Sequence, residues 1–249
     1  MDRRLVRRFV ELAGGPDVAR VAVVPTASEE VAETATRYVA AFEREGVHDV
    51  DVLDVRSHAD AEAPATLAAL GEATGVMFTG GDQKRLLDIF EGTSFVAELR
   101  RRGRSGLLVG GSSAGAMALG DPVIVRGEPT EFYEDGAIRR APGLGLVAGA
   151  TVDTHLVVRG RLPRLIAMVA AYPDVVGLGL EEGCGLEVSP VGVATVLGEG
   201  VVCVVEGTGR GAGPATAGPG RALSVAGLTV HVLADGGRYD LCARRVLRT

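Results

Sequence analysis

The 249-residue chain contains no tryptophan, a single lysine and three cysteines, and aromatic residues make up only 4% of it. Because three cysteines without metal-ligand spacing cannot all be paired, we expect reduced, mostly buried thiols and no metal or cofactor. No apolar run approaches the roughly 18 residues that cross a bilayer, and no signal-peptide core follows the first methionine. We therefore expect a cytoplasmic protein with no membrane partner. The net charge of −6 argues against a nucleic-acid partner.

Apolar strands alternate with amphipathic helices along the first 120 residues. Strands are expected within 20–28, 50–56, 75–78 and 106–110, and helices over 3–13, 29–45, 65–73, 83–91 and 94–102. This alternation is typical of an α/β fold, with a doubly wound, mostly parallel sheet flanked by helices. The chain opens with a helix, although such a fold normally opens with a strand.

The last third of the chain has a different pattern. Residues 186–207 and 222–241 are short β-branched runs separated by glycine turns, which indicate antiparallel strands. We expect one α/β domain over 1–249 whose C-terminal portion, about 186–249, is rich in β-structure.

The stretch GGSSAGAMALG, residues 110–120, joins a predicted strand to a predicted helix and fits G-x-S-x-G with Ser113 in the middle. In a nucleophile elbow, such a serine occupies a strained turn and the next N–H, here that of Ala114, stabilises an oxyanion. A phosphate-binding loop or an ordinary tight turn is the alternative.

FTGGDQ, residues 78–83, passes from strand to glycine turn to helix in the same way. The N–H groups of this turn, Gly81 above all, are candidates for the second oxyanion donor. Alternatively, Asp82 simply caps the helix.

A serine nucleophile needs a base and a carboxylate that orients it. Of the four histidines, His155 is the best candidate for the base because it lies among polar residues just after a strand-like run, beside Asp153. For the acid, Glu131 lies between the serine and the histidine in chain order, whereas the rivals Glu181 and Glu182 follow another apolar strand.

Four motifs in this order, FTGGDQKRL, GGSSAGAMALG, VDTHLVVRGRLPRL and GLGLEEGCGLEV, resemble the cyanophycinases, which are grouped with the aspartyl dipeptidases among serine peptidases. The resemblance extends from PTAS at 25–28 to LTVHVL at 228–233. It implies a class I glutamine-amidotransferase-like fold and a metal-independent exopeptidase that forms a homodimer. Its substrate would be cyanophycin, a poly-aspartate with arginine on each side chain, or a related β-aspartyl peptide, cleaved to β-aspartyl-arginine.

Carried over by residue, the resemblance makes Ser113 the nucleophile and His155 the base, with Glu131 as first choice for the orienting acid. It also implies a substrate pocket, in which arginines would bind carboxylates and Glu182 a guanidinium. The pocket residues are Gln83, Asp153, Arg159, Arg161 and Glu182.

The chain departs from the family pattern in two places. It lacks the usual opening strand with its Gly-Gly acidic loop, and Thr154 stands where glutamine is common in the D-Q-H triplet. An inactive protein that binds β-aspartyl peptides and a small aspartyl dipeptidase are therefore alternatives. A nucleotide-binding module is a weaker one, because neither glycine turn continues into Gly-Lys-Ser/Thr.

Overall fold

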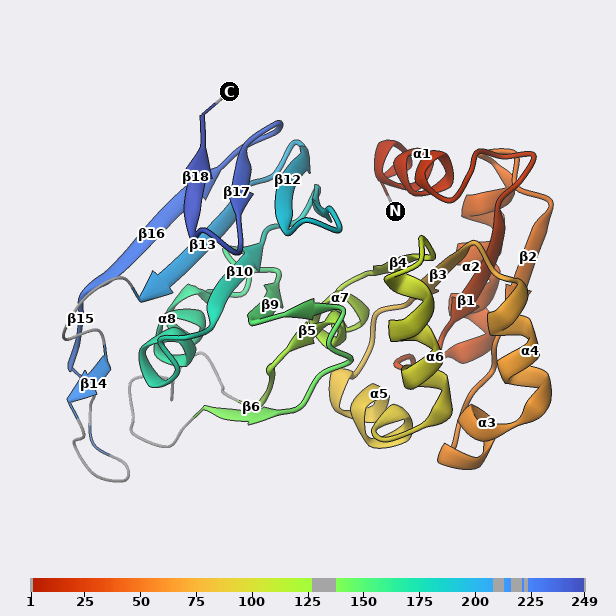
Figure 1. Ribbon diagram of the computed structural model, residues 1–249, viewed down its shortest axis with the longest axis horizontal. Coiled ribbons are helices and arrows are strands. Elements are labelled where there is room, and N and C mark those ends of the chain that lie inside the picture. Colours follow the sequence, from red (N-terminus) through yellow and green to blue (C-terminus); the bar gives the residue numbers. More distant parts are fainter. Residues whose placement is uncertain (1, 127–137, 208–212, 216–220, 222–223, 249) are drawn as a thin grey trace. The chain divides into compact units, whose positions relative to one another are not determined.

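The computed structural model describes residues 2–126, 138–207, 213–215, 221 and 224–248 (Figure 1). The chain forms two compact units, Met1–Leu119 with Pro142–Leu146 and Gly120–Ala141 with Val147–Thr249. Each is described by itself, and a single domain over 1–249 stays a prediction. No helix in the described part of the chain is both long and apolar enough to cross a membrane.

The first unit is built on a parallel sheet with strand order β2-β1-β3-β4. Its strands are β1 (Arg20–Val24), β2 (Asp49–Val52), β3 (Gly75–Phe78) and β4 (Leu108–Gly111). Its helices are α1 (Arg3–Leu12), α2 (Val31–Glu43), α3 (His58–Glu62), α4 (Pro64–Glu72), α5 (Gln83–Phe90), α6 (Ser94–Gly103) and α7 (Ala114–Leu119). The predicted alternation of parallel strands and helices is confirmed, and α3 is an additional short helix.

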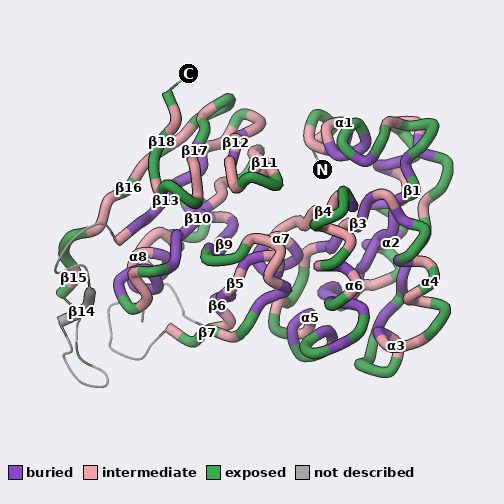
Figure 2. Tube along the Cα trace, viewed as in Figure 1, coloured by how far each residue is buried: buried purple, intermediate pink, exposed green. Residues whose placement is uncertain are grey.

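Helices cover both faces of this sheet, so β1 is buried from Val21 to Val24 (Figure 2). On one face, Val21 and Val23 pack in a cluster with residues of α1 and α2. On the other, Phe78 of β3 stacks edge-on against Phe90 at 5.9 Å between ring centroids. Burial on two faces explains why the strands read as apolar runs rather than as alternating patterns.

The opening helix α1 packs directly on the sheet. Phe9 contacts Phe42 of α2 at 5.4 Å between ring centroids, and its ring reaches the backbone of β4 at Gly110. A Cβ atom at Gly110 would lie 2.8 Å from the Phe9 ring, so only glycine admits the ring at this distance. Helix α1 is thus part of the core of the first unit.

The second unit contains a mixed sheet and a separate antiparallel one. The larger has the order β16-β13-β10-β9-β5-β8. In it β9 is parallel to β10, whereas β13 is antiparallel to both of its neighbours, β10 and β16. The smaller has the order β11-β12-β17-β18. The antiparallel C-terminal portion predicted from sequence is confirmed.

The described residues of this unit form one helix, α8 (Leu162–Ala171), and strands β5 (Gly120–Asp121), β6 (Val123–Arg126), β7 (Arg139–Ala141), β8 (Val147–Ala148), β9 (Ala150–Thr154), β10 (Val176–Leu180), β11 (Cys184–Val188), β12 (Val193–Gly198), β13 (Val202–Gly207), β14 (Gly213–Ala215), β15 (Ser224–Ala226), β16 (Leu228–Leu233), β17 (Arg238–Asp240) and β18 (Arg245–Leu247). The helix packs on β10 and β13 through Leu165, Met168 and Val169.

A buried carboxylate links the mixed sheet of the second unit to the antiparallel sheet that contains β17. Glu206 of β13 is 3% exposed. It accepts a hydrogen bond from the Tyr239 hydroxyl at 2.8 Å and contacts Nε2 of His231 at 2.8 Å. Burial first, and then the hydrogen bond to Glu206, raise the pKa of Tyr239 well above its usual value of 10.

We predict that Gly110→Ala destabilises the protein by about 1–3 kcal/mol, because the new methyl group overlaps the Phe9 ring. Urea unfolding measures the change. Gly71→Ala is the control: it lies in α4 with no heavy atom near its Cβ position, and it should stabilise by about 0.5–1 kcal/mol. Equal effects of the two substitutions would contradict the role given to Phe9.

We also predict a loss of stability in alkali. Above pH 10 the folded state keeps the Tyr239 proton while the unfolded state releases it. The contribution of this tyrosine to the free energy of unfolding is therefore complete below pH 10 and is lost as the pH rises further. The slope is up to about 1.4 kcal/mol per pH unit for this one proton. Unfolding at a series of pH values should show a shallower alkaline slope for Tyr239→Phe, and an unchanged slope would contradict the assignment.

Candidate active site

Ser113 lies in a sharp turn between β4 and α7. Its backbone has φ 51°, in the left-handed region that non-glycine residues rarely adopt. The turn is fixed from both sides, because Ser112 N–H donates to the Phe78 carbonyl at 3.0 Å and Met117 N–H donates to the Ser113 carbonyl at 2.9 Å. A strained serine at a strand-to-helix turn is the geometry of a nucleophile elbow.

The glycines of the motif are required by close packing. A Cβ atom at Gly115 would lie 2.3 Å from the Phe78 carbonyl oxygen, and one at Gly111 would lie 2.4 Å from the carbonyl carbon of Gly115. Helix α7 therefore lies against the end of β3 with no room for side chains. Its first residue, Ala114, has its N–H in the turn where a helix leaves donors without internal acceptors.

The glycine turn after β3 lies beside the serine. A Cβ atom at Gly80 would be 3.3 Å from Cβ and 3.9 Å from Oγ of Ser113. Gly81 has φ 141°, and a Cβ atom there would overlap the Ala27 carbonyl oxygen at 1.9 Å. The N–H groups predicted to bind an oxyanion thus belong to backbone next to the candidate nucleophile. Gln83 is the first residue of α5, immediately after this turn.

Tyr38 of α2 joins the two turns, and sequence reasoning missed it. Its side chain is 6% exposed. Burial raises the pKa of Tyr38, while hydrogen bonds that its phenolic oxygen accepts from the Ser112 side chain and the Gly80 backbone N–H act in the opposite direction. In the sequence it is one apolar-face residue of an amphipathic helix, so nothing marks it until the turns are folded.

His155 and Glu182 meet in the second unit. His155 follows β9 and also has a left-handed backbone, with φ 56°. Its Nδ1 lies 2.8 Å from Oε1 of Glu182, which follows β10. Because β9 and β10 are parallel with Thr154 opposite Leu180, the residues after these strands become neighbours. Glu131, the first choice for the orienting acid, lies outside the described residues.

Asp153 is fully buried in β9. Its Oδ2 accepts a hydrogen bond from Nε of Arg164 at 2.6 Å, and Arg161 lies 3.7 Å from Oδ1. Arg161 also donates to the Thr154 carbonyl at 2.9 Å. With 0% of its side chain exposed, Asp153 is suited to holding these arginines. Its predicted contact with substrate, like that of the exposed Arg159, stays a prediction.

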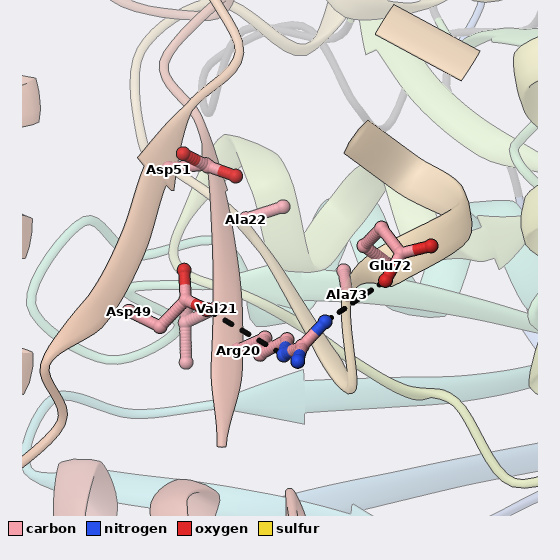
Figure 3. Close-up of a pocket in the computed structure, with 7 residues that line it drawn as sticks. All are labelled: Arg20, Val21, Ala22, Asp49, Asp51, Glu72 and Ala73. Atoms are coloured by element: carbon pink, nitrogen blue, oxygen red, sulfur yellow. Dashed lines mark hydrogen bonds and ion pairs between the residues drawn. The ribbon is translucent and has the colours of Figure 1, made fainter. Parts of the chain in front are cut away.

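A cavity of about 220 Å³ lies elsewhere in the first unit (Figure 3). Arg20, at the start of β1, binds Glu72 at 2.8 Å and lies 3.5 Å from Asp49, at the start of β2. These are the amino-terminal ends of the strands, whereas Ser113 follows the carboxyl end of β4. Ligands of parallel α/β sheets bind at the carboxyl ends, so this cavity is not the candidate site.

Among the described residues, no three His, Cys, Asp or Glu side chains are grouped as metal ligands would be. The candidate residues divide between the two units. The first unit holds Gly81, Gln83, Ser113 and Ala114, and the second holds Asp153, His155, Arg159, Arg161 and Glu182.

Comparison with known proteins shows the family to which the chain belongs. Residues 2–196 match the model of Peptidase family S51. The cyanophycinase of Trichormus variabilis is 36% identical over 98% of this chain and 83% of its own length. That of Synechococcus elongatus is 36% identical over 98% of this chain and 76% of its own length.

Among solved structures, a peptidase from an acI-B1 Actinobacterium has the same fold, with a TM-score of 0.70, 18% identity, and coverage of 96% of this chain and 90% of that one. The length of the family match and the identity to the curated relatives show that the chain belongs to peptidase family S51, a family of serine-type peptidases.

Proposed function

We propose that the protein is a cyanophycinase-like serine exopeptidase, which hydrolyses cyanophycin or related β-aspartyl peptides to β-aspartyl-arginine. The observation that carries the proposal is Ser113, held in left-handed backbone between β4 and α7 beside the Gly80–Gly81 turn. The name cyanophycinase, borne by relatives 36% identical over nearly the whole chain, supplies the substrate class. As part of this proposal we also expect a cytoplasmic homodimer.

The proposed reaction passes through an acyl-enzyme. Ser113 Oγ attacks the carbonyl carbon of the scissile amide while His155 accepts the hydroxyl proton. The N–H groups of Gly81 and Ala114 stabilise the oxyanion. The C–N bond then breaks, and His155 gives its proton to the leaving amine. Water attacks the resulting ester, His155 takes a proton from that water, and the C–O bond breaks with return of the proton to Ser113.

The orienting acid in this proposal is Glu182. A carboxylate on Nδ1 fixes the tautomer of the ring and stabilises the imidazolium, which leaves Nε2 to exchange protons with the serine. The 2.8 Å contact between Glu182 and Nδ1 of His155 supports Glu182 over Glu131. The arginines after His155 remain the proposed partners of substrate carboxylates, with Arg159 the exposed one.

Ser113→Ala should lower the rate of β-aspartyl-arginine release from cyanophycin by at least about 10³-fold, since the nucleophile is lost. The measurement follows free amine release with purified protein, using circular dichroism to check the fold. Ser105→Ala is the control: its hydroxyl bonds only a helix carbonyl in the described structure, and full activity is expected. Unchanged turnover in Ser113→Ala would refute the assignment.

The same assay separates the proposal from its alternatives. Release from α- or β-aspartyl dipeptides but not from the polymer would indicate a dipeptidase. Binding of β-aspartyl-arginine without hydrolysis of any substrate would indicate a binding protein.

Glu182→Gln should lower kcat by about 10²- to 10⁴-fold, because the neutral amide no longer stabilises the imidazolium and permits the wrong tautomer. Glu131→Gln should change kcat by less than about threefold, on the scale of a residue outside the triad. Steady-state kinetics of both variants on cyanophycin decide between the two acids. A large loss in Glu131→Gln with none in Glu182→Gln would restore Glu131 as the orienting residue.

A further inference from the structure

The turn that carries His155 needs an anchor. A non-glycine residue in left-handed backbone costs about 1–3 kcal/mol and persists only where its surroundings hold it. Glu182 contacts the imidazole ring but not the backbone that places the ring. The chain after His155 turns through residues 156–160 before α8 begins, so the anchor has to act on these residues.

The carboxylate of Glu181 supplies this anchor. Its Oε2 accepts hydrogen bonds from two successive backbone N–H groups, those of Val157 and Val158, the latter at 3.4 Å. Burial pushes the pKa of Glu181 upward, but the surrounding backbone N–H groups and the charge of a protonated His155 outweigh it and hold the pKa below its usual range. Glu181 is therefore ionised at neutral pH, so its side-chain oxygens act only as acceptors for the backbone N–H groups of the turn.

Glu181 itself is fixed to the sheet. The Glu181 N–H donates to the Val201 carbonyl at 3.0 Å, and the Glu181 carbonyl oxygen lies 3.1 Å from Sγ of Cys184. One residue earlier, the Leu180 carbonyl accepts the N–H of Leu156 at 3.2 Å. The turn is thus bonded to β10 and to the side chain that follows it.

We propose that Glu181 is a positioning residue for catalysis: by bonding the Val157 and Val158 N–H groups, its carboxylate holds the His155 turn in left-handed backbone so that Glu182 can orient the ring. This inference rests on the proposed function, in which His155 is the base. Of the two consecutive glutamates, Glu181 then holds the backbone of the turn and Glu182 orients the imidazole ring.

Two conservative substitutions of Glu181 distinguish the effect of side-chain length from the effect of side-chain charge. Glu181→Gln keeps an oxygen at the same distance from the backbone, so its kcat should stay within about threefold of wild type. Glu181→Asp keeps the charge but shortens the side chain by one methylene, so the carboxylate no longer holds the turn and His155 is displaced. Displacement of the base should lower kcat by about 10- to 100-fold. KM should change by less than about threefold in both, since neither variant removes a proposed substrate contact.

Asp240→Ala is the matched control. Asp240 also accepts two successive backbone N–H groups, those of Cys242 at 3.0 Å and Ala243 at 2.8 Å, in a turn of the C-terminal sheet that carries no proposed catalytic residue. It should lower stability in urea while leaving kcat unchanged. Amide hydrogen exchange reports the contact without any substrate: Val157 and Val158 should lose protection in Glu181→Asp and keep it in Glu181→Gln.

The catalytic readout is made twice, with cyanophycin and with a sulfonyl fluoride that labels an activated serine. Labelling of Ser113 should slow in Glu181→Asp by the same factor as kcat. Wild-type rates in Glu181→Asp, or a Glu181→Gln variant as slow as Glu181→Asp, would overturn the inference. Labelling of wild type without cyanophycin hydrolysis would instead overturn the proposed function alone, because the positioning of His155 is still measured by the label.

Discussion

Left-handed backbone is the constraint shared by Ser113 in the first unit and His155 in the second, the proposed nucleophile and the proposed base. Each residue follows a parallel strand and turns the chain abruptly, which exposes one side chain at the carboxyl end of a sheet. Neither turn is the preferred conformation of its own residue. The surrounding packing and hydrogen bonds must therefore stabilise both turns, and these surroundings account for much of the local sequence.

The two turns are held by different means. Around Ser113, backbone hydrogen bonds are combined with close packing, because Gly115 lets α7 lie against the end of β3 and Gly111 lets it lie against the end of β4. Around His155, side-chain carboxylates make the contacts: Glu181 accepts from the backbone of the turn and Glu182 contacts the ring. The buried Asp153–Arg164 pair joins the strand before this turn to the helix after it.

The sequence was sufficient to predict most of the first unit and the position of Ser113 in a strand-to-helix turn. Parallel strands buried on two faces give apolar runs, and a glycine-flanked serine between strand and helix is specific in that context. The contact between Glu182 and His155 could not be predicted from chain order, because it depends on the β9–β10 register, a long-range pairing that leaves no local pattern. Tyr38 was missed for a similar reason: its hydroxyl acquires a role only when two distant turns come together. The helix over 3–13 looked anomalous because a doubly wound fold normally opens with a strand, and composition gives no sign that this helix packs on the bare backbone of Gly110.

Glu181 and Glu182 are adjacent, and their side chains serve different atoms of the same turn. Directly after them, Gly183 turns the chain with φ 74° into β11. Inserting one residue between Leu180 and Glu182 would leave one of these two contacts without a carboxylate, even though both glutamates were retained. The spacing of this segment is thus as strongly constrained as its composition, and two acidic residues at another spacing would not make the same pair of contacts.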